Sequence, residues 1–216
     1  IRMVMSASAA LRDEVLADAS IVEALALEQG LSPAGVRYAL NAYLEVEATD
    51  HEIATMCARA ERAFGRTETL AHAPHHQREV RVVLSANVLT APSRALAWAW
   101  AQAPQVVVRP SQRAVGWVTR LVDRIHDPRI RLLPARRDAP LWDGADPSRT
   151  LVHVYGGSQA VASIEASATA GGFLLEAHGP ALGAALVEAR EPAVTPTTAG
   201  CLAEDIVAFD QRGCLS

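Results

Sequence analysis

The sequence predicts an α/β protein in which a parallel sheet follows a group of N-terminal helices. Short β-branched and apolar runs begin at residue 79, and helical segments of about 10 to 15 residues separate them. Strands that alternate with helices form βαβ units, whose strands are parallel. Continuous apolar runs such as Val106-Val107-Val108 are typical of a sheet that is covered on both faces.

The first 78 residues are predicted to be helical. Ser32-Pro33 is typical of an N-cap followed by proline in the first turn. Asp50 is the expected cap of a helix over residues 51–64, which Gly65 ends. This pattern carries no chemistry of its own, so we interpret it as a helical segment in front of the sheet.

From residue 79 to residue 216 the sequence predicts one α/β domain. Its predicted strands cover residues 79–85, 105–108, 130–133, 151–155 and 172–176. Its predicted helices cover residues 93–103, 112–125, 158–170 and 197–210. The chain is therefore divided into a helical segment, residues 1–78, and an α/β domain, residues 79–216.

Composition excludes several classes of protein. Half of the 216 residues are apolar and the net charge is −4, which argues against disorder. A pI near 6.0 argues against nucleic-acid binding, and no apolar run approaches the roughly 20 residues of a membrane helix. The three cysteines, with no CxxC pair, indicate neither a disulfide framework nor a cysteine-rich zinc site, so we expect a cytoplasmic protein.

No metal site is expected. A small histidine cluster lies in a proline-containing loop, with no carboxylate or cysteine at ligand spacing, and it comprises His72, His75 and His76. Lysine is absent, so every cationic task falls to arginine; genomic base composition explains this absence well enough.

Candidate ligand-binding residues follow three of the predicted strands. Gly156-Gly157-Ser158 joins a strand to a helix, where backbone N–H groups can hold an anion, although a tight turn without a ligand explains it equally well. Arg109 ends a strand, and Ser111 is placed to cap the next helix; a solvated arginine is the alternative. Asn87 is either a turn former or an amide donor to an oxyanion.

The last candidate is Cys214, in the stretch Asp210-Gln211-Arg212-Gly213-Cys214. A glycine and polar neighbours favour an accessible thiol, whereas free cysteine is most often a small buried hydrophobe. The residues alone leave a nucleophilic role and a structural role equally open.

Taken in order, these landmarks resemble the aldehyde dehydrogenase superfamily, and most closely its LuxC-like fatty acyl-CoA reductase branch. The resemblance covers residues 80–216 and is carried by three stretches. They are residues 82–88 (VVLSANV), 152–158 (VHVYGGS) and 204–216 (EDIVAFDQRGCLS). The resemblance implies the Rossmann-like cofactor-binding domain of that superfamily, preceded by helices.

The resemblance also implies roles for the landmark residues. Cys214 would take the acyl group as a thioester, and Asn87 with the N–H of Cys214 would form the oxyanion hole. NADPH, without a metal, would reduce that thioester to an aldehyde, with Arg109 near the ribose 2′-phosphate. Ser111 and Gly156-Gly157-Ser158 would lie near the cofactor.

Two features of the sequence depart from this family. Glu176 matches the position of the superfamily's general base, which the reductase branch does not hold firmly. His178 either lines the site instead or has a buried structural role, which is the more common case. The chain stops two residues beyond Cys214, which favours a fragment or a site that a partner completes.

Partners follow from the same resemblance. They would be an acyl-CoA or acyl-protein substrate, an acyl-donating enzyme, and further copies of the full-length chain. The alternatives are an NAD-dependent aldehyde dehydrogenase that uses Glu176 as the base, and a non-catalytic nucleotide-binding fragment.

Overall fold

The computed structural model describes residues 1–179, except 86–87 and 137–139, and four residues beyond them (196, 199, 200 and 203). Asn87, Cys214 and most of the predicted helix over residues 197–210 lie outside the described residues. Within the part that is described, no helix combines the length and apolar character that a membrane span requires.

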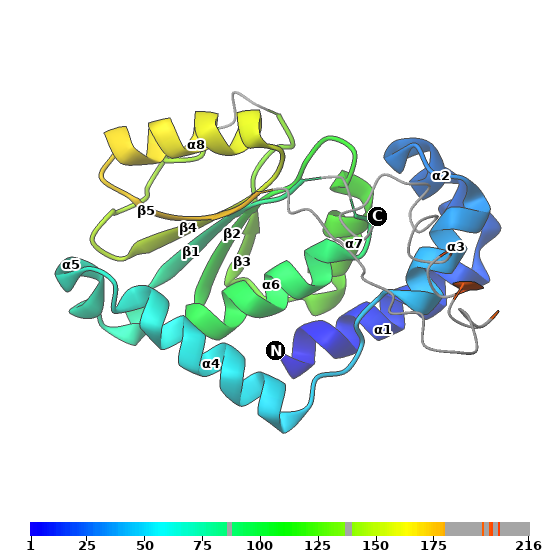
Figure 1. Cartoon of the computed structure of the whole chain (residues 1–216), viewed down its shortest axis with the longest axis horizontal. Helices are drawn as coiled ribbons and strands as arrows, with labels where there is room; N and C mark the ends of the chain where they lie inside the picture. Colours follow the sequence, from blue (N-terminus) through cyan, green and yellow to red (C-terminus); the bar gives the residue numbers. More distant parts are fainter. Residues whose placement is uncertain (86–87, 137–139, 180–195, 197–198, 201–202, 204–216) are drawn as a thin grey trace.

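A five-stranded parallel sheet forms the centre of the fold, which confirms the predicted α/β class (Figure 1). The strand order is β3-β2-β1-β4-β5. The strands are β1 (Glu79–Val83), β2 (Gln105–Arg109), β3 (Ile130–Leu132), β4 (Thr150–Tyr155) and β5 (Leu174–His178). In this order the direction of winding reverses between β1 and β4, which is where ligands bind in open α/β sheets.

Helices cover both faces of the sheet (Figure 1). On one face lie α6 (Ala91–Gln102) and α7 (Val115–Ile125), and on the other lies α8 (Ser158–Ala170). Alternate strand residues point to opposite faces. Val82 and Val108 therefore join the core under α6 and α7, whereas Val83, Val107 and Val154 join the smaller core under α8.

The helical segment packs on the outer side of α6 and α7, through α1 and α4. Its helices are α1 (Arg2–Ala17), α2 (Ala19–Gln29), α3 (Pro33–Ala42), α4 (Asp50–Phe64) and α5 (Glu68–Ala71), followed by the 3₁₀ turn η1 (His75–Gln77). One core cluster runs from this segment to the sheet. The helical segment and the sheet therefore share one core. The domain boundary after residue 78 stays a prediction from the sequence.

Thr49, and not Asp50, caps α4. The Thr49 hydroxyl accepts a hydrogen bond from the Glu52 amide, and the Glu52 carboxylate accepts one from the Thr49 amide. This reciprocal pair satisfies two free N–H groups, which a lone Asp50 cannot do, and Asp50 instead places its charge in the first turn. Ser32 caps α3 and Gly65 ends α4, as predicted.

Strand β5 begins two residues later than predicted. Gly171 caps α8, and Gly172 has a φ of +73°, which is the left-handed region that glycine enters without strain. Both glycines therefore belong to the turn, and the strand runs over Leu174–His178. Glu176 and His178, two residues apart in one strand, consequently share a face of the sheet.

Arg81 fixes the long connection between β3 and β4. Its side chain is fully buried in β1, on the α8 face. The guanidinium donates to the backbone oxygens of Leu141 and Asp143 and pairs with the Glu79 carboxylate at 2.6 Å. The described residues of this connection form turns and no helix, so a side chain supplies donors to two of its carbonyls.

Replacing Arg81 by leucine is expected to lower the free energy of unfolding by roughly 2–4 kcal/mol, because two carbonyls and a carboxylate lose their partner in the interior. Urea unfolding measured by circular dichroism tests this expectation. The control is Arg94→Leu, which removes an exposed pair with Glu45 and should cost about 1 kcal/mol or less. Equal losses in the two variants would contradict the anchoring role of Arg81.

Candidate active site

An apolar cavity of about 220 Å³ lies at the carboxyl edge of the sheet, where β1, β4 and β5 end. The first turns of α6 close one side of it. Its lining residues are Leu84, Ser85, Val88, Ala91, Pro92, Ala95, Tyr155, Gly156, His178 and Gly179. Because this position is the switch point of the strand order, it is the place where the fold predicts a ligand.

Two aromatic rings form one wall of the cavity. Tyr155 ends β4, and its ring stacks on the imidazole of His178 with centroids 4.2 Å apart and planes 7° from parallel. The register pairs these two residues across β4 and β5. Burial raises the pKa of the Tyr155 phenol well above its usual value, so the group stays protonated and neutral.

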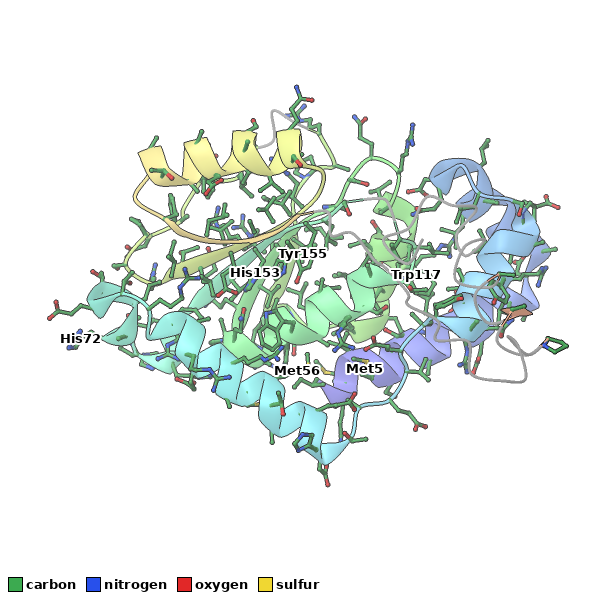
Figure 2. The ribbon with its side chains drawn as sticks, viewed as in Figure 1. Met5, Met56, His72, Trp117, His153 and Tyr155 are labelled. Atoms are coloured by element: carbon green, nitrogen blue, oxygen red, sulfur yellow. The ribbon has the colours of Figure 1, made fainter. Side chains whose placement is uncertain are left out.

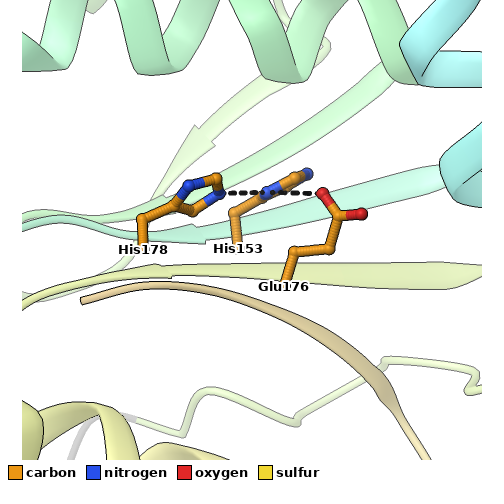
Figure 3. Close-up of side chains that lie close together, drawn as sticks. All are labelled: His153, Glu176 and His178. Atoms are coloured by element: carbon orange, nitrogen blue, oxygen red, sulfur yellow. Dashed lines mark hydrogen bonds and ion pairs between the residues drawn. The ribbon is translucent and has the colours of Figure 1, made fainter. Parts of the chain in front are cut away.

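A buried histidine lies directly behind this wall (Figures 2 and 3). His153 is fully buried on β4, and its Nδ1 lies 3.0 Å from Nε2 of His178 and 3.5 Å from a Glu176 carboxylate oxygen. The other ring nitrogen, Nε2, contacts the side-chain oxygen of Gln102, the last residue of α6. Figure 2 shows His153 and Tyr155 close together beside α6, two residues apart along β4.

Burial holds the two histidines in their neutral form. Burial and, to a smaller extent, the neighbouring His178 together lower the pKa of His153 to about 3. Burial also lowers the pKa of His178, although the Glu176 carboxylate opposes that shift. Both rings therefore carry one proton each at neutral pH.

Glu176 lies behind the cavity wall, next to His153. Its carboxylate pairs with Arg66 at 3.2 Å and approaches His153, and it is not among the cavity-lining residues. His178, two residues further along β5, reaches the lining instead.

Arg109 ends β2 at the same edge of the sheet, next to the cavity. Its carbonyl accepts a hydrogen bond from Leu84, a cavity residue. The side chain is half-buried, and burial lowers the pKa of its guanidinium; no described carboxylate is paired with it. A partly desolvated cation of this kind is suited to an anionic ligand.

Ser111 does not cap α7, contrary to the prediction. The helix begins three residues later than expected, at Val115, with Ala114 as its N-cap. The reason is a turn in which the Ala114 amide donates to the Ser111 carbonyl. The Ser111 hydroxyl is buried and has no hydrogen-bond partner among the described residues, so it remains available to a ligand.

The glycine turn lies where the sequence predicts it. Gly157 is the N-cap of α8, no side chain caps this helix, and no acidic residue occupies its first turn. A Cβ added at Gly157 would meet no atom within 4 Å, so the backbone is open on that side. The Gly156 amide donates to the His178 carbonyl, which joins the turn to β5.

The structure thus brings Gly156 to the cavity and Arg109 and Ser111 to the neighbouring strand end. Asn87 and Cys214 lie outside the described residues, although Ser85 and Val88, on either side of residues 86–87, line the cavity. Sequence reasoning missed His153 and Gln102. The alternation His153-Val154-Tyr155 marks two side chains on one face of the strand, but their neighbours depend on a register that the sequence does not reveal.

One family model matches the chain. It is that of acyl-CoA reductase (LuxC), and the match covers residues 141–216. A comparison with curated protein sequences finds no match. Together with the fold, the family match confirms the predicted resemblance to the aldehyde dehydrogenase superfamily and its LuxC-like branch.

Solved structures with a similar fold include aldehyde dehydrogenases. Lactaldehyde dehydrogenase from Escherichia coli superposes with a TM-score of 0.53 at 17% identity, over 82% of this chain and 38% of that one. An NAD-dependent benzaldehyde dehydrogenase from Corynebacterium glutamicum gives 0.50 at 17% identity, over 83% and 40%. The chain therefore spans less than half the length of these proteins, and the likeness shows the fold.

The neutral His153 makes stability depend on pH. Below about pH 6.5 the unfolded chain binds a proton at this residue, whereas the folded chain does not until about pH 3. The free energy of unfolding is therefore expected to be about 2 kcal/mol lower at pH 5 than at pH 7. Urea unfolding at both pH values measures it, and His153→Gln should remove most of the difference.

The exposed His76 provides the control for this measurement. His76→Gln should leave the difference between pH 5 and pH 7 as it is in the unchanged protein. A His153→Gln protein that keeps the full difference would show that the dependence arises elsewhere.

Proposed function

We propose that the chain carries the cofactor-binding part of an NADPH-dependent acyl-CoA reductase, an oxidoreductase that converts an acyl thioester to an aldehyde. The observation that carries this proposal is the position of the family match. Residues 141–216 include β4, α8 and β5, and these elements contribute Tyr155, Gly156, His178 and Gly179 to the cavity at the switch point. The segment that resembles acyl-CoA reductases is therefore the one that builds this wall of the cavity.

The described residues fit a nicotinamide dinucleotide phosphate. The half-buried Arg109 and the unpartnered hydroxyl of Ser111 lie at one strand end, and the guanidinium can bind a phosphate with two parallel hydrogen bonds. The open glycine turn at the N-terminus of α8 supplies further N–H groups near the cavity. A bound cofactor would supply the hydride.

The chain's own residues would then divide the reaction into two easier steps. The Cys214 thiolate attacks the thioester carbonyl, the bond from carbon to the CoA sulfur breaks, and CoA leaves as the thiol after taking up a proton. The Asn87 amide and the Cys214 backbone N–H stabilise the oxyanion. Hydride from a bound cofactor would add to the carbonyl carbon of the enzyme thioester, and breakage of the bond from this carbon to the Cys214 sulfur would release the aldehyde and restore the thiolate.

The position of Glu176 favours reduction over the oxidation of aldehydes. An aldehyde dehydrogenase needs a base that activates water at the acyl-enzyme, and the Glu176 carboxylate pairs with Arg66 away from the cavity. Reduction of a thioester by hydride needs no activated water, so it does not require Glu176 at the reacting carbon.

The proposed reaction requires an acyl donor. The acyl donor would be acyl-CoA or an acylated enzyme that delivers its acyl group, and the full-length protein would assemble with copies of itself. The exposed thiol of Cys57, with no disulfide among the described residues, supports a reducing, cytoplasmic setting.

Arg109→Gln is expected to weaken NADPH binding by about 10- to 100-fold, because a charge-assisted contact to the 2′-phosphate is lost. NADH, which lacks this phosphate, should bind with nearly unchanged affinity. Titration of the dihydronicotinamide fluorescence measures both affinities, and Arg120→Gln, on the outer side of α7, is the control. An equal loss for NADPH and NADH would contradict the assignment of Arg109 to the phosphate.

The thioester step has its own test. The chain is incubated with a long-chain acyl-CoA, and intact-mass and peptide mass spectrometry locate the added acyl group. We expect one acyl group on Cys214, none in Cys214→Ser, and no change in Cys57→Ser, which removes an exposed thiol. Acylation that persists in Cys214→Ser, or no acylation of the unchanged chain, would contradict the proposed nucleophile.

A further inference from the structure

We propose that His153, His178 and Glu176 form a binding site for a divalent transition-metal ion, with Zn²⁺ as the reference ion, in the wall of the cavity. Their donor atoms all lie within 4.8 Å of one another, and they come from two adjacent strands (Figure 3). Two imidazoles and one carboxylate are a donor set of zinc sites that keep an open position. This inference is independent of the proposed reductase activity.

The first argument is the protonation of His153. Its Nε2 faces the side-chain oxygen of Gln102, an acceptor, so Nε2 carries the proton and Nδ1 carries the lone pair. Nδ1 is the atom that faces His178 and Glu176. Gln102 therefore orients the ring as the outer partners of metal-binding histidines do.

The second argument is the spacing of the two imidazoles. Zn²⁺ binds nitrogen at about 2.0–2.1 Å, which places two ligand nitrogens about 3.0–3.4 Å apart at ordinary bond angles. His153 Nδ1 and His178 Nε2 are 3.0 Å apart. In the neutral pair the His178 Nε2–H donates to His153 Nδ1, and for an ion to bind both nitrogens this proton moves to Nδ1 of His178, so no net proton leaves the two rings.

The third argument is the carboxylate. Glu176 has an oxygen 3.5 Å from His153 Nδ1 and must approach His178 by roughly 1 Å to bind the same ion. Its side chain is partly exposed and ends in a flexible carboxylate, so this movement requires no shift of the strand. Its partner Arg66 is about half exposed and can turn into solvent when a cation replaces it.

Burial adds to these contacts. His153 is fully buried, so an ion held by it would lie at the edge of the protein interior, where water has little access. The surface histidines differ in this respect. His72 follows α5 and is exposed, and Figure 2 shows it well apart from His153 and Tyr155. His75 and His76 are exposed in η1.

Measuring the binding of Zn²⁺ and Co²⁺ to the untagged chain at pH 7.5 tests the proposal. A background in which Cys57, Cys201 and Cys214 are serine excludes thiolate binding, and circular dichroism confirms that each variant is folded. We expect one ion per chain by calorimetry, and Co²⁺ absorption bands of a four-coordinate site. His178→Gln and Glu176→Gln should each weaken Zn²⁺ binding at least tenfold, and a triple change of His72, His75 and His76 to glutamine should not.

Arg66→Gln is expected to change the Zn²⁺ affinity in the opposite direction. Loss of the competing cation frees the Glu176 carboxylate, so Zn²⁺ should bind several-fold more tightly than in the unchanged protein. Stoichiometry below one, tight binding that survives His178→Gln, or binding that disappears with the three surface histidines would overturn the site. Unchanged or weaker binding in Arg66→Gln would overturn the role of Glu176 as a ligand.

Discussion

The buried guanidinium of Arg81 is the constraint on which the arrangement of this sheet depends. The chain passes from β3 at one edge to β4 beyond β1 through a connection whose described residues form no helix. Such a stretch exposes carbonyl groups that secondary structure does not satisfy, and Arg81 supplies donors to two of them from the centre of the sheet. β4 can therefore lie against β1 and reverse the direction of winding, which opens the cavity at their carboxyl ends.

With β4 between β1 and β5, alternate residues of each strand point to the same face of the sheet. This alternation determines which side chains meet at the site. His153 and Tyr155 face the α6 side from β4, and Glu176 and His178 face the same side from β5. The parallel register sets each of these four side chains against a partner on the neighbouring strand. The four side chains form a polar cluster between the apolar cavity and the helices that cover this face. In such surroundings hydrogen bonds and charges act more strongly than in water.

Much of this fold could be predicted from the chain. The β-branched runs and the helical periods identify the five strands, and the glycine turn before α8 and the arginine that ends β2 lie where their neighbours indicate. These features are local, since each depends on a few consecutive residues. The predicted limits of β5 and the predicted cap of α4 were wrong, because Gly172 and Thr49 act through hydrogen bonds that composition does not reveal.

The cluster behind the cavity could not be predicted, because it depends on which strands are neighbours. His153 and Glu176 are far apart in the sequence and meet through the pairing of β4 with β5. Gln102 joins them from the end of α6, a contact between residues 51 positions apart. A histidine in an apolar strand indicates burial, but the groups that surround it are a property of the folded chain.

Helix α6 contacts both the cavity and the buried histidine behind it. Its first turns close the cavity through Ala91, Pro92 and Ala95, and its last residue, Gln102, holds His153. A helix of this length is a rigid rod of about 16 Å, so its two ends move together. Because α1 and α4 pack on its outer side, the N-terminal helices support this rod along its length. Residues remote from the cavity thereby back both its closed side and the imidazole behind it.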